Sequence, residues 1–500
     1  MSEVGPTDPT TSDGPPPPAP PPPPTSLARR AAASVGFVGL VVAVELLRQP
    51  GARTWDTVWA EDGTIYAEQA IHLPALTALT RPYAGYVQLL PRLLALPARV
   101  LPVAWYAPWF AVAGALTAAL LGLLVVHSAE GWITNRGLRW LVGLTVATTP
   151  TVAYELNANV VNLNWLLLAT SFWVIASRRR GAAETTLRAC VLALAALSTP
   201  LTAVMVPFAV VVTVRRRRRP DLVVLGALLG GLALQAAIAV GAVRAPASGR
   251  DYGHATEGFF VRVVGSLVLG ERWLSDLFPV HTHLVIFGSV AVVVAIAALA
   301  RADRLRGDRA WFVGSAVFTA VLVYALAAVA RGTDWMPFAA PDGSFTNAGS
   351  RYEYVPIFLL TSAIVVLVDR SRLDWLKALV AAWVLVVLVS SWGPTSSRSA
   401  GPDWSAAVRQ AQADCRAHPD QAEALLPITP FTWRVAIPCS RLRDPDRWFD
   451  RRATGQRTDA PAGAPTTAPA TPPDALVGRW NGPWPVGGYG TMTRTGPSGR

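Results

Sequence analysis

Much of this 500-residue chain is divided into apolar runs of about 17 to 25 residues, and clusters of arginine border several of these runs. A run of that length crosses the hydrocarbon core of a bilayer as a single α-helix. The apolar residues are continuous within each run and are not spaced along one helix face, as they would be in an amphipathic helix. The pattern predicts an all-α, polytopic transmembrane helix bundle with the lipid bilayer as its partner.

Composition and charge support this interpretation. Only 15% of the residues are charged, against about 25% in an ordinary soluble domain. The net charge of +12 would otherwise suggest nucleic-acid binding, but the arginines lie directly beside apolar runs, as in Arg178 to Arg180 and Arg215 to Arg219. Such placement is typical of the positive-inside rule, by which arginine-rich loops stay in the cytoplasm. We therefore expect no nucleic-acid partner.

The order of runs and arginine clusters predicts ten or eleven spans in the cell membrane, with the N-terminus cytoplasmic and the C-terminus extracytoplasmic. Every short arginine-rich loop falls on one side in this count. The count depends on residues 187–214, which form either one span or two short crossings broken at Pro200, because proline disfavours helix before it. The expected spans lie near residues 31–47, 103–126, 137–154, up to 177, 187–214, 222–243, 283–300, 311–330, up to 368 and up to 392.

Four regions follow from this reading. Residues 1–27 form a disordered, proline-rich cytoplasmic tail, and residues 28–392 form the transmembrane domain. Residues 393–450 form a small extracytoplasmic segment, and residues 451–500, rich in Pro, Ala, Thr and Gly, are expected to be disordered. Cys415 and Cys439 lie in the extracytoplasmic segment, where a disulfide between them is favoured over two free thiols.

Three longer loops are expected on the outer side: one after the first span, one over residues 244–281 and one between residues 331 and 352. The first contains apolar residues at helical spacing near Thr64–Leu79 and Tyr86–Leu96. These stretches are too short and too interrupted to span a bilayer. We expect them to be helices that lie in the membrane interface.

The first loop begins with Trp55-Asp56-Thr57-Val58-Trp59-Ala60-Glu61-Asp62-Gly63, hereafter the acidic segment. Carboxylates between interfacial tryptophans are positioned to meet the polar head of a lipid-linked substrate. One of these acids is suited to act as a general base for a sugar hydroxyl, or to hold a divalent cation on a phosphate. The alternative is a solvated loop between aromatic residues without chemistry.

At this point the chain resembles the GT-C superfamily of polyprenyl-phosphate-sugar-dependent glycosyltransferases, in architecture over residues 30–392 more than in letters. The resemblance implies an essential acid in the first outer loop. That acid maps to Asp62, with Glu61 and Asp56 as less favoured candidates, because the sequence has Glu61-Asp62 where the family has an Asp-Glu or Asp-Asp pair. It also implies a lipid-linked sugar donor.

Other polar residues are candidates for substrate binding. Gln88 and Arg92 are placed to face an anionic head group, and Arg351 with Tyr352 to hold a lipid phosphate. Snorkelling at the end of a span is the alternative for Arg351. No zinc-protease helix, phosphate loop or nucleophile elbow is present in the sequence.

The leading hypothesis is a membrane glycosyltransferase that transfers a sugar from a polyprenyl-phosphate donor to a cell-envelope acceptor. Its rivals are a transporter or lipid flippase, and a non-catalytic envelope assembly protein. A transporter should carry ionisable residues inside its membrane helices, whereas the spans expected above leave nearly all acids in outer loops. That placement favours the enzyme.

Overall fold

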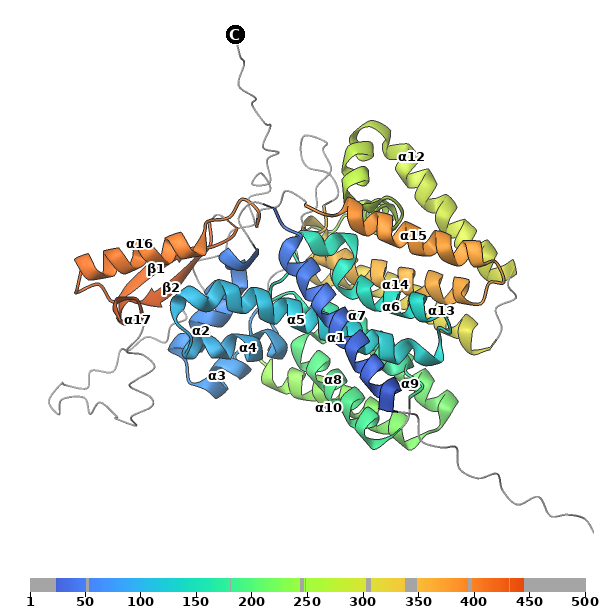
Figure 1. Cartoon of the computed structure of the whole chain (residues 1–500), viewed down its shortest axis with the longest axis horizontal. Coiled ribbons are helices and arrows are strands. Elements are labelled where there is room, and N and C mark those ends of the chain that lie inside the picture. The colour runs from blue at the N-terminus through green and yellow to red at the C-terminus, as the bar shows by residue number, and fades with distance from the viewer. Residues whose placement is uncertain are drawn as a thin grey trace, which may run out of the picture.

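The computed structural model describes residues 24–50, 54–179, 181–242, 247, 249–302, 307–337, 349–393, 398–430 and 432–444. Helices gather into one bundle, and a small sheet lies at its edge beside α2 to α4 (Figure 1). The tails expected to be disordered lie outside the described residues, except that residues 24–27 already belong to the first helix. The helices are α1 (Pro24–Leu47), α2 (Glu68–His72), α3 (Ala75–Thr80), α4 (Leu89–Ala95), α5 (Tyr106–Ser128), α6 (Arg136–Thr148), α7 (Leu163–Ala176), α8 (Ala182–Ser198), α9 (Met205–Arg216), α10 (Arg219–Ile238), α11 (Tyr252–Gly258), α12 (Ser266–Ala302), α13 (Asp308–Arg331), α14 (Arg351–Asp369), α15 (Asp374–Ser390), α16 (Trp404–Ala417) and α17 (Cys439–Arg443).

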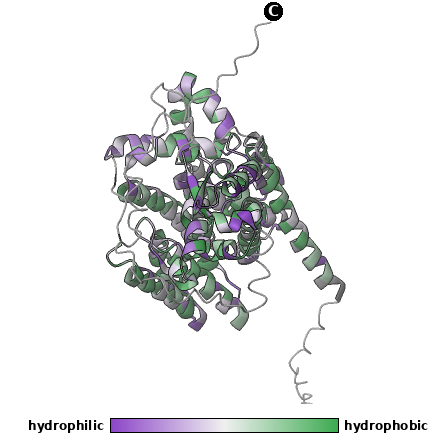
Figure 2. Ribbon diagram, turned by 90° about the vertical axis from the view of Figure 1, so that its left-hand side faces the viewer, coloured by the Kyte–Doolittle hydropathy of each residue, from purple (hydrophilic) through white to green (hydrophobic). Residues whose placement is uncertain are grey.

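Six stretches of described helix are long and apolar enough to cross a membrane, which indicates a multi-pass membrane protein. Apolar residues cover most of the helical ribbon (Figure 2). Helices α6, α7, α8, α9 and α15 are 12 to 17 residues long, so the count of ten or eleven spans stays a prediction. The six stretches are residues 28–47, 103–131, 219–238, 252–294, 308–331 and 351–369.

Helix α5 forms the centre of the N-terminal half and packs against α1, α6 and α7. Close approach to α6 depends on two glycines. A Cβ atom at Gly122 would lie 2.6 Å from the carbonyl oxygen of Gly143, and one at Gly143 would lie 2.3 Å from a methyl carbon of Val126. Small residues at such crossings let helix backbones meet, which is how membrane helices associate without a hydrophobic driving force between them.

The break expected at Pro200 is present. Helix α8 ends at Ser198, a 3₁₀ turn covers Pro200–Val204, and α9 begins at Met205. The hydroxyl of Thr199 accepts a hydrogen bond from the backbone N–H of Leu201 at 3.4 Å, which satisfies a donor at the start of the turn.

Most of the outer loop expected over residues 244–281 is helical in the structure. Residues 252–302 form α11, a π-helical segment (Phe259–Gly265) and α12 in continuous succession. Arg262 and Glu271 lie within this expected loop, but both side chains are buried. Arg262 forms an ion pair with Glu353 of α14, 91 residues away, whereas Glu271 accepts a hydrogen bond from the nearby Ser266 hydroxyl.

The chain beyond the helix bundle also departs from the all-α prediction. Strands β1 (Glu423–Pro427) and β2 (Arg434–Pro438) pair antiparallel, with Leu425 opposite Ala436. Alternate side chains of each strand are buried, as expected for a sheet with one covered face. We call α16, β1, β2 and α17 the C-terminal subdomain.

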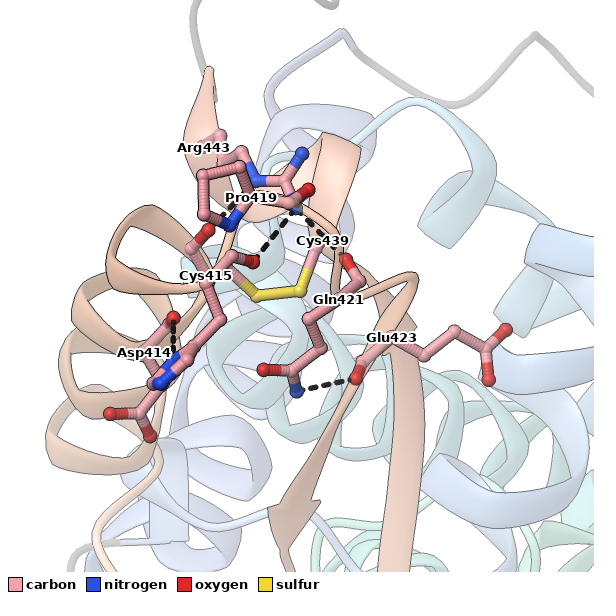
Figure 3. Close-up of a disulfide and its surroundings, with 8 residues drawn as sticks. Asp414, Cys415, Pro419, Gln421, Glu423, Cys439 and Arg443 are labelled. Atoms are coloured by element: carbon pink, nitrogen blue, oxygen red, sulfur yellow. Dashed lines mark hydrogen bonds between the residues drawn. A yellow bond between two sulfur atoms is a disulfide. The ribbon is translucent and has the colours of Figure 1, made fainter.

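Cys415 at the end of α16 and Cys439 at the start of α17 form a disulfide within this subdomain (Figure 3). The guanidinium of Arg443 caps the same junction. It donates hydrogen bonds to the carbonyl oxygens of Cys415, Pro419 and Gln421 at 2.9, 2.6 and 2.9 Å. Disulfide and arginine together fix α16 and α17 to the turn that leads into β1.

Candidate functional site

The acidic segment leads from α1 into a π-helical turn at Asp62–Ala67. The C-terminal subdomain holds it from one side, because Trp59 and Thr429 form an isolated parallel β-bridge. Thr429 donates its backbone N–H to the carbonyl of Val58, and the N–H of Ala60 donates to the carbonyl of Thr429. Gly63 allows this close approach, since a Cβ atom would lie 2.7 Å from a methyl carbon of Ile428, whose side chain would have to shift.

Asp62 points into the protein and is fully buried. Its two carboxylate oxygens accept hydrogen bonds from the backbone N–H groups of Val160 and Val161 at 3.1 and 2.8 Å. Burial raises the pKa of Asp62 to about 7, against the opposing effect of these hydrogen bonds and of Arg398. Both oxygens are thus engaged in joining the acidic segment to the turn between α6 and α7.

Arg398, just before the C-terminal subdomain, completes this arrangement. Its guanidinium is buried and donates hydrogen bonds to the carbonyl oxygens of Thr54, Asn157 and Ala158 and to the hydroxyl of Thr57. Burial lowers its pKa to about 10, so the group stays cationic at neutral pH. We call Asp62, Arg398 and residues 157–161 the buried junction.

Asp56, the third acid of the segment, contacts the C-terminal subdomain. Its carboxylate oxygens accept from the backbone N–H and the hydroxyl of Ser405 at 2.8 and 3.0 Å. Ser405 lies in the first turn of α16, whose backbone N–H groups have no partner within the helix. Asp56 therefore caps α16 from a distant part of the chain, while Trp404 stacks on Tyr106 with ring centroids 6.2 Å apart.

Glu61 faces away from the buried junction and is partly exposed. Burial raises the pKa of this carboxyl above its usual range, and Arg351 is the strongest opposing charge. Glu155 raises the pKa further and Arg331 lowers it. The two adjacent carboxyls of the acidic segment therefore differ in their surroundings: Asp62 is fully buried, whereas Glu61 is partly exposed.

A tight turn at Ala84 and Gly85 places Tyr83 beside Glu61 and Tyr86 beside Arg331. Tyr83 and Tyr86 exchange backbone hydrogen bonds of 2.9 and 3.2 Å. Ala84 and Gly85 have φ values of 53° and 91°, as a two-residue hairpin turn requires. The pKa of Tyr83 is raised by burial and by Glu61, so its phenol stays protonated at neutral pH.

Arg331 and Arg351 approach the same place from the ends of α13 and α14. Arg351 lies 3.6 Å from the Glu155 carboxylate and above the ring of Tyr352, at 5.1 Å from its centroid. Arg331 shares a hydrogen bond with the Tyr86 phenol. Within the described part of the chain, Arg331 has no carboxylate at ion-pair distance. The Arg–Tyr cluster, as we name it, comprises Glu61, Tyr83, Tyr86, Glu155, Arg331, Arg351 and Tyr352.

Gln88 and Arg92, expected to bind substrate, lie inside the first long loop and are buried. Gln88 accepts a hydrogen bond from the Tyr66 hydroxyl and donates to the carbonyl of Tyr83. Arg92 donates to the carbonyls of Val87 and Ala78, both at 2.6 Å. These contacts hold the tyrosine turn and the short helices in place, so Arg351 and Tyr352 are the expected binding residues that reach the cluster.

Among the residues that the structure describes, no three His, Cys, Asp or Glu side chains gather closely enough to hold a metal ion. A divalent cation beside Glu61 would therefore need oxygens from a substrate, such as phosphate, to complete its shell.

Sequence reasoning missed Arg331, Tyr83 and Arg398 as site residues. The sequence Tyr83-Ala84-Gly85-Tyr86 is typical of a tight turn, so it could have predicted that the two tyrosines lie together. Arg398 carries no local signal, because its partners lie 240 to 344 residues away.

The chain matches no family model, no curated protein and no solved structure.

Proposed function

We propose that this chain is a membrane glycosyltransferase of the GT-C type, which moves a sugar from a polyprenyl-phosphate donor to a cell-envelope acceptor. In this proposal the N-terminus is cytoplasmic and the C-terminal subdomain extracytoplasmic in the cell membrane. The short helices α2 to α4 then lie in the outer interface. The Arg–Tyr cluster lies on that same outer side in this proposal.

The observation that carries the proposal is the meeting of Glu61 with Arg331 and Arg351 at one end of the bundle. Sugar transfer needs a base for the attacking hydroxyl and positive charge for the phosphate that leaves. Glu61 supplies an accessible carboxylate. Arg331, without a carboxylate partner in the described chain, supplies a guanidinium suited to two parallel hydrogen bonds with a phosphate.

The step proceeds as an inverting displacement in this proposal. The acceptor hydroxyl gives its proton to Glu61 as its oxygen attacks the anomeric carbon, and the bond from that carbon to the phosphate oxygen breaks. The bonding electrons pass to the polyprenyl phosphate, whose added charge Arg331 and Arg351 neutralise. Tyr83 and Tyr86 lie beside the position of the sugar in this proposal. Each offers an apolar ring face and a phenol hydroxyl that can donate a hydrogen bond. We assign Glu61 in preference to Asp62, because backbone donors occupy both oxygens of Asp62.

The experiment compares membranes from a deletion strain that carries the wild type, Glu61→Gln or Arg331→Gln. We expect each variant to accumulate the same lipid-linked sugar as the empty strain and to reduce transfer by about 10² to 10⁴-fold for Glu61. Glu257→Gln is the matched control, since Glu257 is an exposed glutamate of α11. Wild-type transfer by Glu61→Gln at wild-type protein level would overturn the assignment of the base.

A transporter or lipid flippase remains the second candidate, and one observation favours it. Arg262, Glu271 and Glu353 are buried within the helices, where the sequence reading expected few charges. Ionisable groups in that position are typical of transport proteins. Translocation of a lipid-linked sugar across reconstituted vesicles without formation of any glycosidic product would favour this candidate over the enzyme.

A further inference from the structure

Three charged side chains form a closed group between α12, α14 and the π-helical segment Phe259–Gly265. Arg262, Glu271 and Glu353 have no solvent exposure. Arg262 lies within the π-helical segment, a rare geometry that is often found at functional sites. Gly270, with φ of 75°, bends the chain just before Glu271, and a Cβ atom there would lie 2.4 Å from the Ser390 hydroxyl.

The two carboxylates, Glu353 and Glu271, have different hydrogen-bond partners. Arg262 donates from Nη2 to Oε2 of Glu353 at 2.7 Å and from Nη1 to the carbonyl of Pro337 at 2.6 Å. Oε1 of Glu271 accepts from the Ser266 hydroxyl at 2.7 Å. In the described part of the chain, Oε2 of Glu271, Oε1 of Glu353 and the Tyr324 hydroxyl make no hydrogen bond.

The charge of the group does not balance if both acids are ionised. One guanidinium then faces two carboxylates, and burying an uncompensated charge costs several kcal/mol. Within the residues that the structure describes, the surrounding elements add no cation: α13 contributes the phenol of Tyr324, and α15 contributes the Ser390 hydroxyl near Gly270. Glu155, which also acts on Glu353, is already paired with Arg351. One bound proton makes the group neutral.

We propose that Glu271 is a proton-binding site of the helix bundle, held in its acid form while Arg262 and Glu353 form an ion pair. Glu353 keeps its charge because it directly contacts the guanidinium, whereas the direct partner of Glu271 is a neutral hydroxyl. The carboxylic acid O–H of Glu271 also supplies a donor in a group where Oε1 of Glu353 accepts no hydrogen bond from a described residue. This proposal is independent of sugar transfer.

The test is labelling of the full-length protein in native membranes with dicyclohexylcarbodiimide. This apolar reagent adds across the O–H of a protonated buried carboxyl and stays attached in full as an N-acylurea. Peptide mapping by mass spectrometry should place the label on Glu271, and labelling should fall about tenfold per pH unit above the pKa of that carboxyl. Glu271→Gln should abolish it.

A second variant tests whether labelling reports protonation of Glu271 or only access of the reagent to that side chain. In Glu353→Gln, Arg262 loses its anionic partner and pairs with Glu271, which then ionises. Labelling of Glu271 should therefore fall about tenfold or more, whereas Glu257→Gln should leave it unchanged. Absence of label on Glu271 at every pH, label on Glu353 in its place, or undiminished labelling in folded Glu353→Gln would overturn the proposal.

Infrared spectroscopy gives a measurement that needs only the isosteric variant. Glutamine matches the shape and neutrality of the protonated acid, so we expect Glu271→Gln to fold. The spectrum of the wild type minus that of Glu271→Gln should contain one protonated-carboxyl stretch that shifts in heavy water. A difference spectrum with only carboxylate bands would contradict the proposal.

Discussion

The buried junction and the Arg–Tyr cluster lie on either side of the acidic segment and use the same residue types differently. In the junction, Asp62 and Arg398 are buried, and their hydrogen-bond partners are backbone groups and the Thr57 hydroxyl. In the cluster, Glu61 and Arg331 are partly exposed, and Arg331 has no carboxylate partner in the described chain. Satisfied charges hold a structure together, whereas incompletely satisfied and accessible charges are available to a ligand.

The substitution Arg398→Ala tests whether the buried junction stabilises the fold, and it has the largest expected effect on stability. The variant leaves three backbone carbonyls and the Asp62 carboxylate without their cation, and removing one partner from a buried charged group costs about 3 to 5 kcal/mol. Thermal unfolding in detergent should show the loss. Arg409→Ala, at an exposed position of α16, should unfold with the wild type. Equal stability of the two variants would show that the junction is not structural.

The second prediction separates the two adjacent acids. In Asp62→Asn, one amide N–H₂ faces a backbone N–H donor, so we expect a loss of about 1 to 3 kcal/mol in the free energy of unfolding. Glu61→Gln should lose less, because burial already disfavours the charged carboxylate that this substitution removes. Denaturation curves of both variants check this. The comparison fails if Glu61→Gln is the less stable protein.

The third prediction sharpens the cluster and has the smallest effect. A base must be ionised, so transfer should fall as the pH drops through the pKa of Glu61, which burial raises above its usual range. Arg351 is the strongest opposing charge, hence Arg351→Gln should move this acidic limb to higher pH. Transfer rates measured against pH in membranes test the sign. A limb that moves to lower pH would exclude Glu61 as the group that titrates.

Much of the helical scaffold follows from apolar run length. The runs ending near residues 47, 126, 330 and 368 correspond to α1, α5, α13 and α14 within a few residues. The break at Pro200 could also be predicted, because a proline acts on its neighbours in sequence. Local signals of this kind need no knowledge of the partner that covers a segment.

The errors share a different cause. Charges at Arg262 and Glu271 predict a loop when each is considered alone, whereas in the structure Arg262 pairs with the distant Glu353 and Glu271 accepts a hydrogen bond from Ser266. Likewise, the letters Glu61-Asp62 locate a candidate site but do not say which acid faces inward. Val160, Val161 and Arg398 decide that orientation, and a pattern confined to one segment carries no information about them.

The bridge between Trp59 and Thr429 makes the packing of the acidic segment depend on residues that are synthesised much later. Ribosomes add about 5 to 20 residues per second from the N-terminus onward. The acidic segment, inserted early, therefore waits about 20 to 70 s for Arg398, which contacts Thr54 across 344 residues. A chain that stops before Arg398 has its helices but an open junction, where buried carbonyls and a carboxylate lack their donors. The segment that carries Arg398 and Thr429 thus completes contacts that the acidic segment cannot form alone.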